Sequence, residues 1–171
     1  WGLILFNATK FLEGEILYKE IFVHYGFLTT IINAILLKVS NENILFVFSF
    51  YSLCYSLGLF FAGLIAYKLT NNLILGFFTI LILFFLHPFT IFPWHSYLTF
   101  FLISIYLYFK CFKITEHQNL ILFLCCVINE SFIYPVILII IFDILFEPIF
   151  LRRKINLNKL KINLLILTLF L

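Results

Sequence analysis

Long apolar stretches separated by short polar turns run through most of the chain. A helix needs about 20 apolar residues to cross a bilayer, with roughly 17 to 25 tolerated. Residues 44–67 meet this requirement outright. Residues 73–86 and 96–109 are shorter, and they span only if their polar edges lie at the interface or the bilayer thins locally. The pattern therefore predicts an all-α bundle of membrane helices.

A polar break interrupts the apolar sequence after residue 119. The tripeptide Asn129-Glu130-Ser131 stands inside it, and Pro135 follows just beyond. Because proline is tolerated in the first turn of a helix, we expect two short helices here rather than one long one. The expected ranges are 119–129 and 132–146, and a further helix begins at 162–171.

Composition supports a membrane protein. Of the 171 residues, 64% are apolar and 11% are charged, whereas soluble domains are roughly half apolar and a quarter charged. This balance excludes a water-soluble globule, a disordered region, a collagen-like fibre and a disulfide-stapled module. The chain contains no Met and ends in the apolar run 164–171. We therefore expect a fragment of a longer multi-pass protein, forming part of a single transmembrane domain.

The net charge of +3 is small and dispersed, which argues against a nucleic-acid partner. The cations serve better as topology markers under the positive-inside rule. If residues 27–39 dip into the membrane and return, eight cations, among them Lys68, lie on one side, and Lys10, Lys19 and Lys38 lie on the other. A full crossing would give ten against one, so charge alone leaves this helix open. Its shortness favours a re-entrant or juxtamembrane helix that follows an outer loop, residues 1–26.

Under this topology, acids and imidazoles gather at the outer rim. Such groups are costly at a membrane edge unless they are paired or face a wet cavity, so they are candidate functional residues. They come from three segments: Glu13, Glu15, Glu20, His24 and Tyr25; then His87, Trp94 and His95; then Asn129 and Glu130.

Several kinds of site have no support in the sequence. The four cysteines form no C-x-x-C pair, and no H-E-x-x-H occurs, so a structural zinc site is not expected. Cysteines inside apolar runs behave as small buried apolar residues. No glycine-rich phosphate loop follows a strand, which leaves nucleotide-dependent chemistry without support.

The segment L-E-G-E-I-L-Y-K-E-I-F-V-H-Y-G-F-L, residues 12–28, carries the most information. It resembles the first outer loop of membrane glycosyltransferases of the GT-C class. The resemblance is to the superfamily of dolichyl-phosphate-mannose protein mannosyltransferases and aminoarabinose transferases. Their loop has a glycine, a tyrosine, a basic residue, an acid, an apolar pair and a second glycine. Those places are filled here by Gly14, Tyr18, Lys19, Glu20, Phe22 and Gly26.

The resemblance implies transfer of a sugar from a polyprenyl-phosphate donor to a lipid, glycan or protein acceptor. The protein would lie among the lipids of a membrane, which we expect to be the cytoplasmic membrane of a prokaryote. Its site would face the non-cytoplasmic side. Glu20 would be the catalytic carboxylate, binding acceptor hydroxyls or a divalent metal ion; no cofactor is certain. The leaving phosphate needs a cation, a metal or hydrogen-bond donors. The expected substrate-binding residues are Tyr18, Lys19, His24, Tyr25, His87, His95 and Glu130.

Three departures from the family pattern keep other interpretations open. The family's essential Asp or Asp-Glu would fall at or before Trp1. Many relatives have an Asp at the segment that corresponds to Trp94-His95-Ser96-Tyr97, which holds no carboxylate here. Phe27 stands where a proline is common. One alternative is a non-catalytic, degenerate transferase. Another is a transporter or flippase, with Asn33 and Asp143 as weak candidates for polar residues at mid-membrane depth.

For three of these residues, a purely structural explanation also remains open. Glu20 is alternatively a solvated loop acid. Glu130 is alternatively a helix cap. His87 precedes Pro88 and alternatively only ends a helix.

Overall fold

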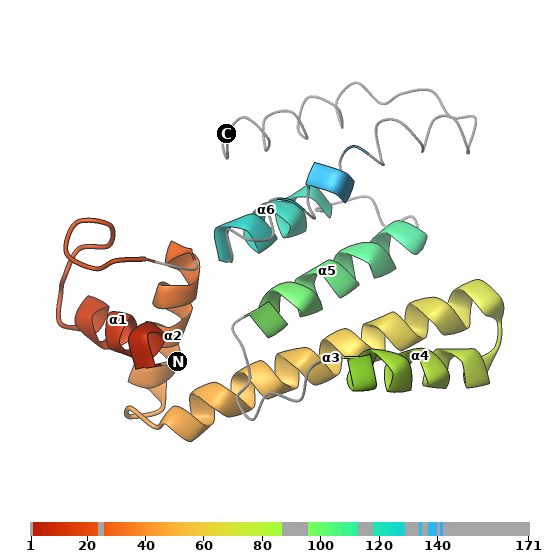
Figure 1. Ribbon diagram of the computed structural model, residues 1–171, viewed down its shortest axis with the longest axis horizontal. Helices are drawn as coiled ribbons and strands as arrows, with labels where there is room; N and C mark the ends of the chain where they lie inside the picture. Colours follow the sequence, from red (N-terminus) through yellow and green to blue (C-terminus); the bar gives the residue numbers. More distant parts are fainter. Residues whose placement is uncertain are drawn as a thin grey trace.

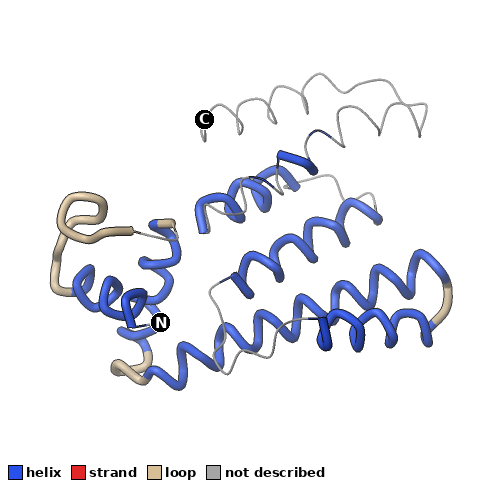
Figure 2. Tube along the Cα trace, in the orientation of Figure 1, coloured by secondary structure: helices blue, strands red, loops and turns tan. Residues whose placement is uncertain are grey.

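The computed structural model describes residues 2–23, 26–86, 96–112 and 118–128, with further positions at 134, 137–139 and 141. The regular structure in these residues is helical, and no strand occurs among them, only an isolated bridge between Leu17 and Ile21 (Figure 2). The all-α prediction is therefore confirmed. The helices are α1 (Gly2–Leu12), α2 (Phe27–Val39), α3 (Ile44–Thr70), α4 (Leu73–Leu86), α5 (Ser96–Cys111) and α6 (Gln118–Ile128).

The long helix α3 organises the rest of the described chain (Figure 1). Helices α1 and α2 pack on each other beside the amino end of α3, and α4 folds back along its second half. Helix α5 packs along α3, and α6 packs on α5 and also meets α2. The loop between α1 and α2 therefore lies at one end of α3, and the α3–α4 turn lies at the other (Figure 1).

Asparagines set the turns at both ends of α3. Asn43 accepts a hydrogen bond at its side-chain oxygen from the Leu45 backbone N–H at 3.0 Å, and so caps the start of the helix. Asn71 ends the helix in a left-handed conformation, with φ of 52°. Asn72 then caps α4 by accepting from the Ile74 N–H at 2.9 Å. Two residues thus reverse the chain and place α4 antiparallel to α3.

Helix α3 is long and apolar enough to cross a membrane. Its 27 residues correspond to a length of about 40 Å, compared with a hydrocarbon thickness of about 30 Å. Only 28% of its most apolar window is buried in the protein, so it differs from the enclosed core helix of a soluble domain. The other apolar helices of the described chain, α1, α2, α4 and α5, are shorter.

Most predicted helix bounds lie close to the observed ones. Helices α2 and α4 begin and end at the predicted residues, and α5 and α6 differ by one or two positions. The prediction for α3 stopped at Tyr67, but the helix continues to Thr70 because no helix-breaking residue stands before Asn71. The helices expected over 132–146 and 162–171 lie outside the described residues, apart from helical positions at 134, 137–139 and 141.

The main core lies where α1, α2, α3, α5 and α6 converge. Its buried members are Ala8, Ala34, Leu37, Val47, Tyr51, Cys54, Tyr97, Leu98 and Ile128. Two small residues, Ala8 and Ala34, are almost completely buried and let α1 and α2 approach closely. This core fixes the helices on both sides of the α1–α2 loop, and it thereby fixes the position of the loop.

Candidate functional site

Gly14 ends α1 and directs the chain into the candidate loop. Its φ is +97°, which favours glycine. The Gly14 N–H donates to the Phe11 carbonyl at 3.1 Å, and the Glu15 N–H donates to the Lys10 carbonyl at 3.1 Å. This pair of hydrogen bonds is the Schellman arrangement of a helix carboxyl end. The glycine expected from the sequence resemblance therefore has a definite structural role.

The loop then closes into a tight turn from Ile16 to Ile21. The Ile16 carbonyl accepts hydrogen bonds from the N–H groups of Lys19, Glu20 and Ile21, at 3.3, 2.9 and 3.2 Å. Glu20 returns across the turn, and its carboxylate accepts from the Ile16 N–H at 2.7 Å. Tyr18 at the tip has a positive φ of 64°. The Glu20 carboxylate thus helps to close the turn on which it is exposed.

A hydrogen bond to α1 anchors the end of this turn. The Asn7 side-chain amide donates to the Phe22 carbonyl at 2.7 Å. Asn7 is itself buried in α1, and Ile21 and Val23, the sequence neighbours of Phe22, are also buried. The carboxyl-terminal end of the turn is therefore tethered, while Tyr18, Lys19 and Glu20 stay exposed. Figure 2 shows the loop projecting from the helices.

Lys10 forms the ion pairs found at this end of the molecule. Its ammonium nitrogen lies 2.9 Å from Glu13 Oε2 and 3.0 Å from Glu15 Oε1. The hydrogen bond to Glu13 is the larger cause, and the one to Glu15 the next, of a pKa of Lys10 that is raised above its ordinary value. The lysine thereby joins the last turn of α1 to the start of the loop, which gives Glu13 and Glu15 a structural role.

A hollow of about 360 Å³ lies between α1, the end of α2 and the start of α3. Two carboxylates, Glu13 and Glu42, stand among its lining residues together with Thr9. Glu42 was absent from the residues expected from the sequence. The polar turn Ser40-Asn41-Glu42-Asn43 between two apolar stretches was the signal that could have identified it.

The end of the loop meets the carboxyl end of α6. A Cβ added to Gly26 would lie 2.7 Å from the Val127 carbonyl oxygen and 2.8 Å from that of Ile128, so only glycine fits. The Thr29 hydroxyl also donates to the Ile128 carbonyl. Residues separated by about a hundred positions in the sequence are thus in direct contact. In sequence, His24 and Tyr25 precede Gly26, and Asn129 and Glu130 follow Ile128.

The structure places three of the expected site residues together, namely Tyr18, Lys19 and Glu20 on one turn. The remaining expected residues lie outside the described part of the chain: His24, Tyr25, His87, Trp94, His95, Asn129 and Glu130. The predicted convergence of all these groups at one rim therefore stays a prediction. Within the described ranges, no group of three or more His, Cys, Asp or Glu side chains is placed to hold a metal ion.

Beneath the loop, polar groups are buried between the helices. Asn33 of α2 is fully buried, and its amide oxygen accepts from the Tyr51 hydroxyl at 3.0 Å. The Asn33 amide nitrogen and the Thr99 hydroxyl have no hydrogen-bond partner among the described residues. The hydrogen bond between Asn33 and Tyr51 connects α2 with α3, and Thr99 lies on α5.

Comparison with known proteins assigns no family to this arrangement. No protein-family model, no curated protein and no solved structure matches the chain.

Proposed function

We propose that this chain is part of a multi-pass membrane glycosyltransferase that takes a sugar from a polyprenyl-phosphate donor. The acceptor would be a lipid, glycan or protein at the outer membrane face. The proposal combines the sequence resemblance of residues 12–28 with two structural features. One is the apolar exterior of the helices, and the other is the anchored turn that carries Glu20.

The apolar exterior supports a membrane location. In α4 only Gly76 is buried, while Leu73, Phe85 and Leu86 expose 73%, 64% and 74% of their surface. Soluble proteins rarely expose contiguous apolar patches larger than a few hundred Å². Lipid or further membrane helices would cover such a surface without cost. A multi-pass arrangement, with α4 and α5 within the bilayer beside α3, follows from this proposal.

The anchored turn is the observation that carries the catalytic part of the proposal. A transferase must hold its polar groups at fixed positions in front of two substrates, because misplacement of about 1 Å is costly. The turn from Ile16 to Ile21 is closed by its own hydrogen bonds and tethered through Asn7. Yet Tyr18, Lys19 and Glu20 remain exposed. The turn thus holds an exposed acid in a fixed position, as a transferase site requires.

The residue types on the turn match the two substrates. Lys19 carries a positive charge that suits the phosphate of the donor, on which negative charge grows as the sugar leaves. The Glu20 carboxylate uses one oxygen to accept from Ile16, and its other oxygen can accept from an acceptor hydroxyl or bind a divalent ion. Because the first hydrogen bond orients the carboxylate, the second oxygen has a defined direction.

The direct test is sugar transfer by the full-length protein in membranes, with a radiolabelled polyprenyl-phosphate sugar as donor. Glu20→Gln keeps an oxygen that can accept from Ile16, so the turn should persist while the charge is lost. We expect transfer to fall about 100-fold or more, as for other positioned acid–base groups. Glu15→Gln, which alters a carboxylate of the Lys10 ion pairs, should retain most of the transfer.

Unchanged transfer by Glu20→Gln would remove this residue from the site. Uptake of the labelled compound into vesicles without any transfer product would instead favour a transporter. Absence of both activities in the full-length protein would favour a degenerate, non-catalytic relative.

A further inference from the structure

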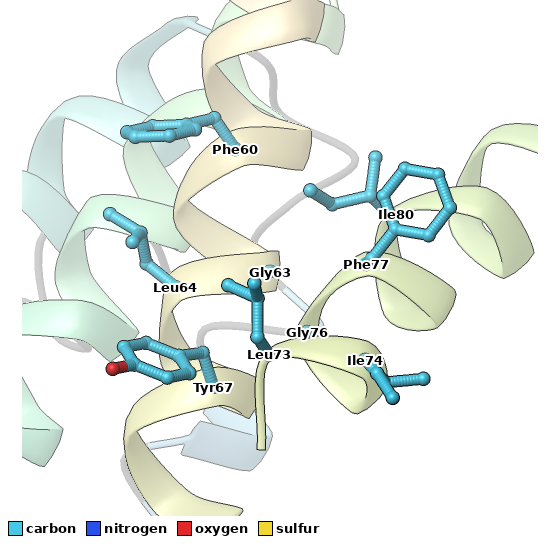
Figure 3. A pocket seen from close by; sticks show the side chains of 9 residues that line it. All are labelled: Phe60, Gly63, Leu64, Tyr67, Leu73, Ile74, Gly76, Phe77 and Ile80. Carbon is cyan, nitrogen blue, oxygen red and sulfur yellow. The ribbon is translucent and has the colours of Figure 1, made fainter. Parts of the chain in front are cut away.

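An apolar groove follows the hairpin formed by α3 and α4, at the end of the molecule opposite the Glu20 turn. It encloses about 440 Å³, a volume within the range of roughly 300–1,000 Å³ found for small-molecule sites. Phe60, Leu64 and Tyr67 line it from α3, and Ile74, Phe77 and Ile80 line it from α4 (Figure 3). The Tyr67 hydroxyl is the single polar side-chain group in this lining.

Two glycines form the floor of the groove. A Cβ on Gly63 would lie 2.6 Å from the Ile80 side chain and 3.1 Å from the Gly76 carbonyl oxygen. A Cβ on Gly76 would lie 2.9 Å from the Gly63 carbonyl oxygen. The backbones therefore touch at this level, and the larger side chains on either side rise above the contact (Figure 3). The hollow is built by this close approach.

The direction of the groove follows from the helix that carries it. Its α3 residues run from Phe60 to Tyr67, about 10 Å along the helix axis. If α3 crosses the membrane, this groove lies in one leaflet and opens to lipid. A linear hydrocarbon chain lying along the hairpin fits an elongated, apolar lining of this kind.

A lysine follows the last α3 residue of the groove lining. Lys68 directly follows Tyr67, and its ammonium lies 5.8 Å from the centre of the Phe112 ring. Lys110 lies in the last turn of the neighbouring α5. The acids in the described part of the chain, Glu13, Glu15, Glu20 and Glu42, all precede α3. Lys68 therefore places a positive charge at the turn end of the hairpin, away from the acids of the described ranges.

We propose that the α3–α4 groove binds a membrane phospholipid with an anionic headgroup. One acyl chain occupies the groove between Gly63 and Gly76, and the phosphate lies at Lys68. Charge complementarity selects this occupant, because the anionic lipids of the cytoplasmic leaflet lie on the side to which the positive-inside rule assigns Lys68. The inference rests on α3 crossing the bilayer and does not depend on transferase activity.

The test uses tryptophan fluorescence of the full chain in vesicles, with Trp1 and Trp94 replaced by Phe. Phe77→Trp places the reporter in the groove, and Phe78→Trp places a matched reporter on the next residue of α4, outside it. Vesicles of phosphatidylcholine contain a small, equal fraction of brominated phosphatidylglycerol or brominated phosphatidylcholine. The brominated chains quench a nearby tryptophan.

We expect brominated phosphatidylglycerol to quench Phe77→Trp at least about threefold more than brominated phosphatidylcholine does. The two lipids should quench Phe78→Trp equally. Adding Lys68→Gln should abolish the preference at Phe77→Trp, whereas Lys38→Gln, a change of an exposed cation on α2, should preserve it. Equal quenching by both lipids in the groove would overturn the proposal. A preference that survives Lys68→Gln would overturn it too.

Discussion

Tyr51 donates its phenolic hydrogen to the side-chain oxygen of Asn33 at 3.0 Å, and both residues are fully buried. The bond joins α3 to α2, the helix that follows the candidate loop. Because a polar group left unpaired in an apolar interior is costly, this pair fixes how the two helices meet. It also accounts for Asn33 as a packing residue, although the sequence had suggested it as a weak candidate for a transport path.

Tyr51→Phe should therefore destabilise the protein by about 1 kcal/mol, since the Asn33 oxygen loses its donor. Reversible unfolding in detergent micelles measures this change. A double-mutant cycle with Asn33→Ala should give a coupling energy of similar size. Tyr67→Phe, at a partly exposed tyrosine of the same helix, should change the free energy of unfolding little. A coupling energy of zero would show that the two side chains act independently.

Gly26→Ala should be more destabilising than Gly14→Ala. Both glycines have a positive φ, +109° and +97°, so each substitution carries a backbone cost of about 1–2 kcal/mol. At Gly14 nothing lies within 4 Å of the added Cβ, but at Gly26 the carbonyls of Val127 and Ile128 obstruct it. The free energy of unfolding should fall by a further 1–3 kcal/mol, roughly, at Gly26. Equal losses would mean that α6 does not pack against this position.

Asn7→Ala should loosen the turn that carries Glu20. The change removes the hydrogen bond to the Phe22 carbonyl, one of the contacts that tether the loop to α1. We expect trypsin to cleave after Lys19 several times faster in the folded protein. Thr9→Val is the matched control, because the Thr9 hydroxyl donates only to the Leu5 carbonyl of its own helix. Identical cleavage rates for Asn7→Ala and the unaltered chain would refute the tether.

The ion pairs of Lys10 should stabilise the protein in a pH-dependent way. Its pKa is raised above the ordinary value of 10.5 by Glu13 and Glu15. A raised pKa contributes stability that is fully present below 10.5 and is lost as the pH rises through the raised value. The difference in unfolding free energy between the unaltered chain and Lys10→Gln should therefore vanish at strongly alkaline pH. A difference that persists undiminished at strongly alkaline pH would contradict this assignment.

The helices were predictable because their signals are local. Gly26 before α2 and Asn72 before α4 mark helix starts in the sequence, and the observed helices follow them. The predicted end of α3 at Tyr67, before the charged Lys68, is three residues too early. Lysine favours a helix intrinsically, and the left-handed Asn71 is what ends it.

The site was predictable only where its residues are neighbours in the sequence. Tyr18, Lys19 and Glu20 were identified together, and they share one turn. The contact of Gly26 with Ile128 joins distant segments, and no local pattern announces it. The polar turn around Glu42 was a local signal, but the hollow that Glu42 shares with Glu13 exists only when α1 packs on α2.

The proposed function requires the Glu20 turn and the α3–α4 turn at Lys68 to lie on opposite faces of a membrane, joined by α3. Labelling of intact cells with a membrane-impermeant maleimide tests it, in a full-length protein without its native cysteines. Ile16→Cys should react from outside, and Lys68→Cys should react only after the membrane is permeabilised. Reaction of both from the same side, or of Lys68→Cys alone from outside, would contradict the account.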